Sequence, residues 1–180
     1  MHGRLERGFT LVEMMIAMLV VGLLLAVAIP AWSNALARTH AAAARAALLA
    51  TLTGAVRHAA ITGTEVVVCP SDGADCRGGW DWTGGWIAYA DSDGDRSRAA
   101  GETLLDRHPP LADDVRLLTS RGRRRLVFQP NGGNAGSNAT FTLCAGRRPP
   151  SATTLVLANS GRFRASRSAA ADRLCADGGG

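Results

Sequence analysis

Arginine is the residue type in this sequence that is best placed to bind a ligand. All 20 basic residues are arginine, and 11 of them fall at or after Val115, where only 2 aspartates accompany them. Because a guanidinium is planar and permanently charged, it binds phosphate through paired hydrogen bonds. In the stretch "SGRFR", a strand would place Arg162 and Arg164 on one face and Phe163 on the other. This half of the chain therefore predicts a surface for a polyanion, with solubility alone as the alternative.

Further arginines are candidates for the same surface. An equally good interpretation is that they are solvated loop charges, because the sequence does not show which of them share a face. Contacts of this kind would reach phosphate groups and would be largely independent of base sequence. The candidates are Arg167, the "RGRRR" residues Arg121, Arg123, Arg124 and Arg125, and the pair Arg147 and Arg148.

The stretch "DSDGDRSRAAGE" spaces its acidic residues as a calcium loop does. Asp91, Asp93, Asp95 and Glu102 occupy the first, third, fifth and twelfth positions of the EF-hand template. However, Arg96 stands where that template needs glycine, and strand-like sequence flanks the loop. An acidic hairpin turn is therefore the better interpretation, with a calcium site as the alternative.

No arrangement of residues in the sequence predicts catalysis. His40 and His58 fall in helical sequence, and His108 precedes two prolines. None of the three has a nucleophile or a set of metal ligands at a recognisable spacing. The sequence therefore predicts a binding or structural protein without cofactor or metal, rather than an enzyme.

Four cysteines follow the N-terminal apolar segment, which is typical of an exported domain closed by two disulfides. Cys69 and Cys76 flank a short loop rich in turn residues, so we expect them to pair, which leaves Cys144 with Cys175. Four cysteines allow three pairings, and the sequence does not choose among them. A zinc site is the weaker alternative, because tight Cys pairs are missing and no histidine is close by in sequence.

The elements that must position these residues begin with a long helix. Met14–Ile29 carries no charge, and a helix that starts at Phe9 would reach about 31 Å by Ile29, which matches a bilayer core of ~30 Å. We therefore expect residues 9–30 to span the membrane, where the carboxylate of Glu13 needs a partner. The alanine-rich sequence that follows predicts that the N-terminal helix, residues 9–62, continues beyond the membrane.

Residues 63–180 are predicted to form a β-rich head. Short runs of β-type residues alternate with Gly, Asp, Asn and Pro, and no helical pattern separates them. An α+β fold is therefore expected, in which antiparallel strands pack on the helix. The residues after Cys175 are expected to form a flexible tail. The expected strands are 65–69, 85–90, 102–106, 115–119, 125–129, 140–144, 153–157 and 161–165.

The stretch "RGFTLVEMM" resembles the class III leader of type IV prepilins and type II secretion pseudopilins. The resemblance implies that a membrane prepilin peptidase cuts after Gly8, removes residues 1–8 as a leader, and methylates the new amino group of Phe9. It also implies a partner for Glu13. The carboxylate would pair with the N-terminal ammonium of a neighbouring subunit, a charge-assisted contact that replaces water during assembly.

A second resemblance covers most of the remaining chain. The stretches "VVVCPSDGADC", "GWIAYADSDGD", "RLVFQPNGG", "TFTLC" and "SGRFR" are similar, in this order, to the GspH/FimT group of minor pilins. This implies a type IV pilin-like fold, with a long N-terminal spine helix packed against a β-rich antiparallel head. Members of the FimT kind carry a C-terminal G-R-x-R element implicated in DNA binding, which here is Gly161, Arg162, Phe163 and Arg164.

Together the resemblances imply a minor type IV pilin that binds extracellular DNA for uptake in natural transformation. The chain would first sit in the bacterial inner membrane as a single-pass protein with its head in the periplasm, and would then enter a pilus at the cell surface. Its partners would be DNA phosphates, other major and minor pilins, and the prepilin peptidase. The alternative is a structural pseudopilin of type II secretion, or a pilus-priming subunit that does not bind DNA.

Overall fold

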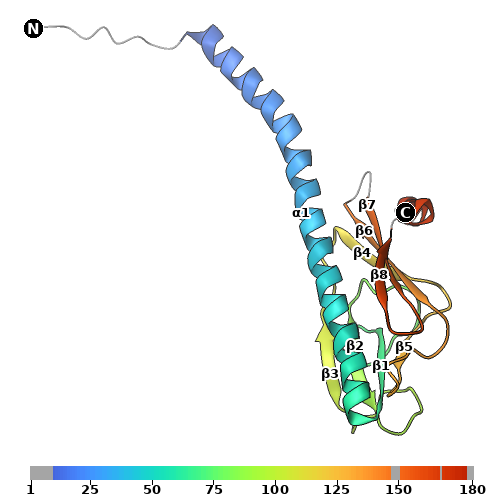
Figure 1. The fold of residues 1–180 in the computed structure, drawn as a ribbon. Helices are drawn as coiled ribbons and strands as arrows, with labels where there is room; N and C mark the ends of the chain where they lie inside the picture. The colour runs from blue at the N-terminus through green and yellow to red at the C-terminus, as the bar shows by residue number, and fades with distance from the viewer. Residues whose placement is uncertain (1–9, 147–150, 167, 178–180) are drawn as a thin grey trace, which may run out of the picture. The chain divides into compact units, whose positions relative to one another are not determined.

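The computed structural model describes residues 10–146, 151–166 and 168–177, and it divides the chain at Leu36 into two units that we describe separately. Each strand expected from the sequence is present, with bounds that differ by at most two residues. Figure 1 shows the elements in order: α1 (Leu11–Thr62), β1 (Glu65–Pro70), β2 (Trp86–Asp91), β3 (Leu104–His108), β4 (Val115–Thr119), β5 (Leu126–Phe128), β6 (Ala139–Ala145), β7 (Ser151–Leu157), β8 (Phe163–Ser166) and α2 (Ala169–Asp177).

The first unit contains the N-terminal half of α1, and none of the residues Leu11–Leu36 is buried. Thr10 caps the helix, because its Oγ1 accepts a hydrogen bond of 3.2 Å from the backbone amide of Glu13. The apolar side chains that follow give one 18-residue stretch of the helix a mean hydropathy of 2.7. The helix is therefore long and apolar enough to cross a membrane. Pro30 lies inside the helix and does not end it.

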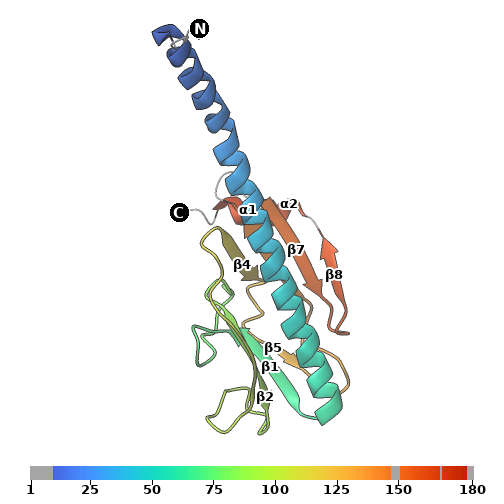
Figure 2. The same cartoon turned by 90° about the vertical axis from the view of Figure 1, so that its left-hand side faces the viewer.

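The second unit contains the rest of α1, which carries a stripe of buried residues. The stripe repeats every three to four residues, the period of one helix face, and Leu48 and Leu52 are completely buried in it. Within this unit, Figure 2 shows the C-terminal half of α1 crossing both sheets. Gly63 ends the helix with a left-handed φ of 73°, and its amide donates to the carbonyl of Ala59.

Two antiparallel four-stranded sheets form the head, in the orders β3-β2-β1-β5 and β4-β6-β7-β8. Alternate residues of both sheets share one hydrophobic core with the buried stripe of α1. Trp82 meets Phe141 edge to face in this core, with ring centroids 5.2 Å apart. The core therefore fixes β8, the C-terminal edge strand, through its pairing with β7.

Two disulfides close the head, and both join the cysteines that the sequence analysis expected to pair. Cys69 bonds to Cys76 across the loop that follows β1, and Cys144 of β6 bonds to Cys175. Cys175 lies in α2, a helix that the sequence analysis missed: it assigned no element to the residues just before Cys175 and expected a tail after it. The helix packs on β6 and β7, and Arg116 donates a hydrogen bond of 2.8 Å to the Cys175 carbonyl.

Candidate nucleic-acid interface

The β7–β8 hairpin brings Arg162 and Arg164 to one place on the head. Val156 of β7 pairs with Arg164 and Leu157 with Phe163, so the strand alternates as the sequence predicted. Phe163 packs against the main core, while Arg162 and Arg164 are exposed. Both arginines line one open hollow of about 450 Å³, together with Ser160.

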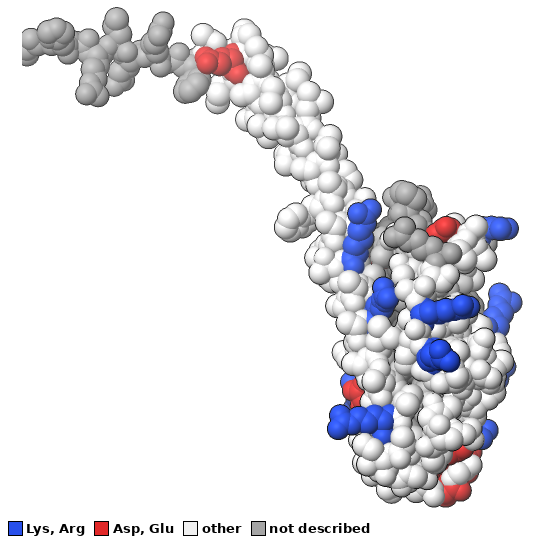
Figure 3. All heavy atoms as spheres, viewed as in Figure 1, with Lys and Arg blue, Asp and Glu red and all other residues white. Residues whose placement is uncertain are grey.

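Neither guanidinium holds another described part of the chain in place. Within the described ranges, the side chains of Arg162 and Arg164 have no hydrogen-bond, ion-pair or ring partner. Their charges are therefore available to a ligand. On the face shown in Figure 3, arginine side chains lie across the middle of the head, and most of the visible acidic atoms lie nearer its edges. We call Arg162 and Arg164 with the hollow that they line the arginine strip.

The turn before β8 is built tightly enough to require glycine. The amide of Gly161 donates to the carbonyl of Ala158 at 3.0 Å, and Gly161 has a left-handed φ of 77°. A Cβ atom on Gly161 would lie 2.5 Å from the carbonyl oxygen of Gly132. The glycine of the G-R-x-R element thus lets two loops approach, and this approach sets where Arg162 leaves the turn.

Two asparagines in the loop of residues 130–138 hold that turn, one through its side chain and one through its backbone amide. The Asn138 Oδ1 atom accepts a hydrogen bond of 3.0 Å from the Asn159 amide, and the Asn159 carbonyl accepts one of 2.8 Å from the Asn134 amide. The sequence analysis did not assign these residues to the site. The signal for them is the loop "PNGGNAGSN", because asparagine side chains readily cap backbone groups in turns.

Arg123 has a structural role rather than a free charge. Its Nη1 atom donates to the Ala135 carbonyl at 2.9 Å and its Nη2 atom to Asn134 Oδ1 at 2.8 Å. Burial lowers the pKa of this guanidinium. Because Arg123 is committed to the loop that supports the turn, it is not a free phosphate ligand.

The other candidate arginines that the structure describes do not join the arginine strip. Arg121 lies over the ring of Trp80, 5.5 Å from its centroid, and Arg124 and Arg125 are exposed around a different hollow. That hollow shares no lining residue with the arginine strip. Five further residues that the sequence analysis named lie outside the described residues: Arg147, Arg148 and Arg167, and the cleavage residues Gly8 and Phe9.

The acidic loop after β2 uses its carboxylates to cap its own backbone. Asp91 is buried and accepts hydrogen bonds from the amides of Gly94 (3.0 Å) and Arg96 (3.2 Å). Burial raises its pKa, and these two amides act in the opposite direction. Glu102 accepts from the amides of Ser92 and Ala99.

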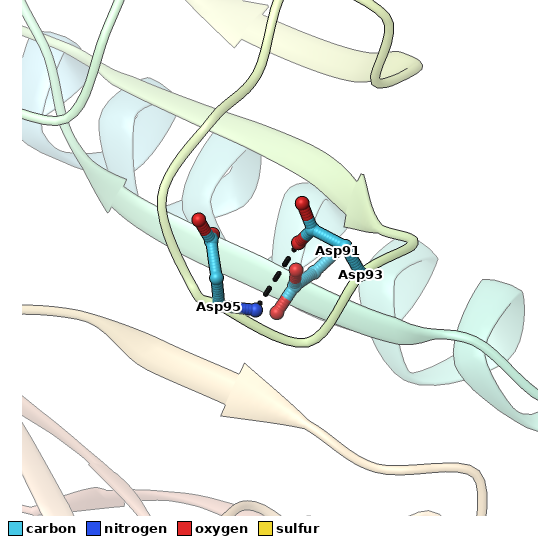
Figure 4. Close-up of side chains that lie close together, drawn as sticks. All are labelled: Asp91, Asp93 and Asp95. Atoms are coloured by element: carbon cyan, nitrogen blue, oxygen red, sulfur yellow. Dashed lines mark hydrogen bonds between the residues drawn. The ribbon is translucent and has the colours of Figure 1, made fainter.

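Only part of the calcium template is therefore brought together. In Figure 4 the side chains of Asp91, Asp93 and Asp95 gather in the loop, with ligand atoms within 4.8 Å of one another. The Asp93 carboxylate also accepts from the Asp95 amide at 3.1 Å. Because Asp91 and Glu102 are both committed to backbone amides, the loop has the geometry of an acidic hairpin turn.

Two of the three described histidines, His40 and His108, make structural contacts through their rings. His40 Nδ1 lies 2.8 Å from Asp114 Oδ1, which joins α1 to the segment before β4. The ring of His108 stacks on Trp86 with centroids 4.0 Å apart. Trp86 in turn donates to Thr51 Oγ1 at 3.0 Å, so these polar groups link α1 to the first sheet.

Comparison with known protein families gives two matches to this chain. The family of the type II transport protein GspH matches residues 44–161, and the prokaryotic N-terminal methylation motif matches residues 3–29. The chain is also 32% identical over 117 residues to the type IV major fimbrial protein FimA of Dichelobacter nodosus. That alignment covers 61% of this chain and 67% of the fimbrial protein.

Two solved structures share the fold. The type IV minor pilin FimU of Pseudomonas aeruginosa strain PAO1 has a TM-score of 0.57 at 19% identity, over 72% of this chain and 90% of FimU. The minor pseudopilin EpsH of the Vibrio cholerae type 2 secretion system has a TM-score of 0.52 at 12% identity, over 71% of this chain and 96% of EpsH. At these identities the likeness concerns the fold alone.

Proposed function

This chain belongs to the GspH family of minor pilins and pseudopilins, and from that premise we propose that it is a pilus subunit that binds extracellular DNA through its arginine strip. The bound DNA would be taken up in natural transformation. The observation that carries the proposal is the pair Arg162 and Arg164: both are exposed, both line one hollow, and neither has a partner in the described part of the chain.

The chemistry of the arginine strip suits phosphate better than bases. Guanidinium groups form charge-assisted, paired hydrogen bonds with phosphate oxygens. Of the described aromatic side chains, Phe163 is the one that lines this hollow, and it packs against the core. A platform for base stacking is thus missing there, and binding would be largely independent of sequence.

Under this proposal, the N-terminal segment is responsible for membrane insertion and for assembly into the pilus. Prepilin peptidase would cut between Gly8 and Phe9 and methylate Phe9. The protein would then wait in the inner membrane, with residues 9–30 in the bilayer and residues 63–180 as the periplasmic head. On assembly, Glu13 would pair with the N-terminal ammonium of a neighbouring pilin, and the head would reach the cell surface.

Binding of the full chain to fluorescent duplex DNA at several salt concentrations tests the proposal. The full chain is held in an uncharged detergent, and the variant carries Arg162→Gln and Arg164→Gln. If each arginine neutralises one phosphate, the slope of log affinity against log salt should fall by about 1–2 units in the variant. The matched control carries Arg57→Gln and Arg107→Gln, two exposed arginines on α1 and β3, and should keep the slope of the wild type.

Two results would contradict DNA binding by the arginine strip. One is equal, weak binding by the wild type and both variants. The other is an equal loss of slope in both variants, which would indicate an effect of net charge alone. Either result would leave a structural pseudopilin or a priming subunit as the function.

A further inference from the structure

A second basic hollow lies on the head where two loops meet. It has a volume of about 550 Å³, and its charged lining residues come from the loop that follows β2 and the loop that precedes β5. We call it the loop hollow. Its charged lining residues are Asp95, Arg96, Arg123, Arg124 and Arg125.

The positive charge of the loop hollow is poorly compensated. Arg123 is bound to Asn134 and to a backbone carbonyl, and both of these partners are uncharged. Arg125 donates only to the carbonyl of Arg96, and Arg124 has no polar partner in the described part of the chain. Four arginines line the hollow beside one carboxylate, that of Asp95, so their mutual repulsion is only partly offset and an anion in this hollow would stabilise them.

Acidic residues nearby offset part of this charge. The closest contact is between Arg96 Nε and Glu65 Oε2 at 3.7 Å, and both side chains are partly exposed, so its contribution is small. Asp95 is exposed, and its carboxylate accepts a hydrogen bond from the Ser97 amide. Among the described residues, Asp95 is therefore the one carboxylate that lines the loop hollow, beside four arginines.

The backbone at the edge of the loop hollow is held in an unfavourable conformation. Arg96 has a φ of 61°, the one positive φ among the described non-glycine residues. Buried Asp91 fixes this conformation by accepting the amide hydrogen of Arg96. In this conformation the Arg96 carbonyl accepts a hydrogen bond from Arg125. The arginines of two loops that are distant in sequence are therefore held together before any ligand binds.

We propose that the loop hollow is a binding site for a phosphate group, with Arg96, Arg124 and Arg125 as its ligands. Several guanidiniums around one hollow suit two or more negative charges with several acceptor oxygens, which a phosphate monoester or successive phosphates of a nucleic-acid backbone supply and a single carboxylate lacks. The phosphate belongs either to a nucleic-acid backbone or to a small phosphorylated molecule. The inference stands apart from the proposed function, because the loop hollow and the arginine strip share no residue.

Calorimetric titration of the full chain, in an uncharged detergent, with inorganic pyrophosphate tests the site. The variant combines Arg96→Gly, which suits the left-handed backbone, with Arg124→Gln at an exposed side chain. Its affinity should fall at least about tenfold, as expected when charge-assisted hydrogen bonds to an anion are lost. The control variant (Arg57→Gln, Arg107→Gln) should bind pyrophosphate as the wild type does.

Arg124→Gln alone keeps the test valid if the double variant unfolds, because Arg124 supports no described contact.

Competition of pyrophosphate with duplex DNA identifies the source of the phosphate. Displacement by DNA assigns it to nucleic acid, and a lack of displacement assigns it to a small phosphorylated molecule. The proposal is wrong if pyrophosphate does not bind, or if it binds equally to the wild type and to the loop-hollow variants. DNA binding by the arginine strip would remain untouched in that case.

Discussion

Gly161 shows how a single residue makes the arginine strip. Its left-handed backbone turns the chain from the Ala158 turn into β8, and its missing side chain leaves room for the Gly132 carbonyl. Any larger residue would push the two loops apart. The arginine that follows would then leave the turn in a different direction, so Gly161 is as much a part of the site as Arg162 is.

Replacement of Gly161 by alanine should lower the free energy of unfolding by about 1–3 kcal/mol, from backbone strain and the close contact with Gly132. Urea unfolding, followed by the near-ultraviolet circular dichroism of the buried Trp82 and Trp86, measures the change. The control is Gly122→Ala, where a Cβ atom would meet nothing within 4 Å and stability should be unchanged or raised by up to about 1 kcal/mol. Equal stability of both variants would show that the turn tolerates a side chain.

For these residues the sequence predicted strand β8 but not the contacts that hold the turn before it. The alternation in "SGRFR" correctly predicted that Phe163 turns inward and Arg164 outward, because strand periodicity is a local property. The contact between Gly161 and Gly132 joins segments far apart in sequence, so no local pattern could predict it. The commitment of Arg123 to Asn134 escaped prediction for the same reason.

Among the elements, α2 depends most on the rest of the molecule. Its alanine-rich sequence favours a helix, yet nine residues are too few to be stable alone in water. Packing on β6 and β7 and the bond from Cys175 to Cys144 hold it on the sheet. The sequence analysis missed α2 because its stability comes from these tertiary contacts, whereas the strands carry their own local pattern and were predicted.

The two disulfides should differ in their effect on stability. Replacing Cys144 and Cys175 by alanine should cost about 3–4 kcal/mol, since that bond closes the longer loop, with a separation of 31 residues. The same change at Cys69 and Cys76, with a separation of 7, should cost about 2–3 kcal/mol. Urea unfolding of the two double variants measures both values. A larger cost for the shorter loop would contradict the loop-entropy argument.

The whole molecule consists of two units that have different environments. The head has a complete core of its own, which includes the buried stripe of α1. In contrast, the helix residues up to Leu36 expose nearly all of their apolar side chains, and these must be covered by lipid or by neighbouring subunits. Glu13 stands at the exposed end of this segment, one turn after its capping residue Thr10.

If Glu13 pairs with the N-terminal ammonium of a neighbouring subunit as proposed, the change Glu13→Gln should keep the chain in the membrane but reduce its incorporation into filaments at least about tenfold, because that ammonium would lose its counter-charge. The amount of the chain in sheared filaments, relative to the membrane fraction, measures the effect. Asp113→Asn, the same change at an exposed carboxylate of the head, serves as the control and should leave incorporation unchanged. Normal incorporation of the Glu13 variant would show that assembly does not use this charge.

The bond between Cys144 and Cys175 also determines how the head responds to mechanical force. The arginine strip lies inside the covalent loop that this bond closes, so tension applied at Arg162 or Arg164 enters the chain between two cross-linked residues. In one direction the tension follows the backbone through β7 to Cys144. In the other it passes through α2 and the sulfur bridge to the same residue. Both paths end in β6, a strand that is paired on one side with β4 and on the other with β7. Tension from a pulled ligand therefore reaches the interior of the sheet. It cannot peel away the edge strand β8 and everything after it.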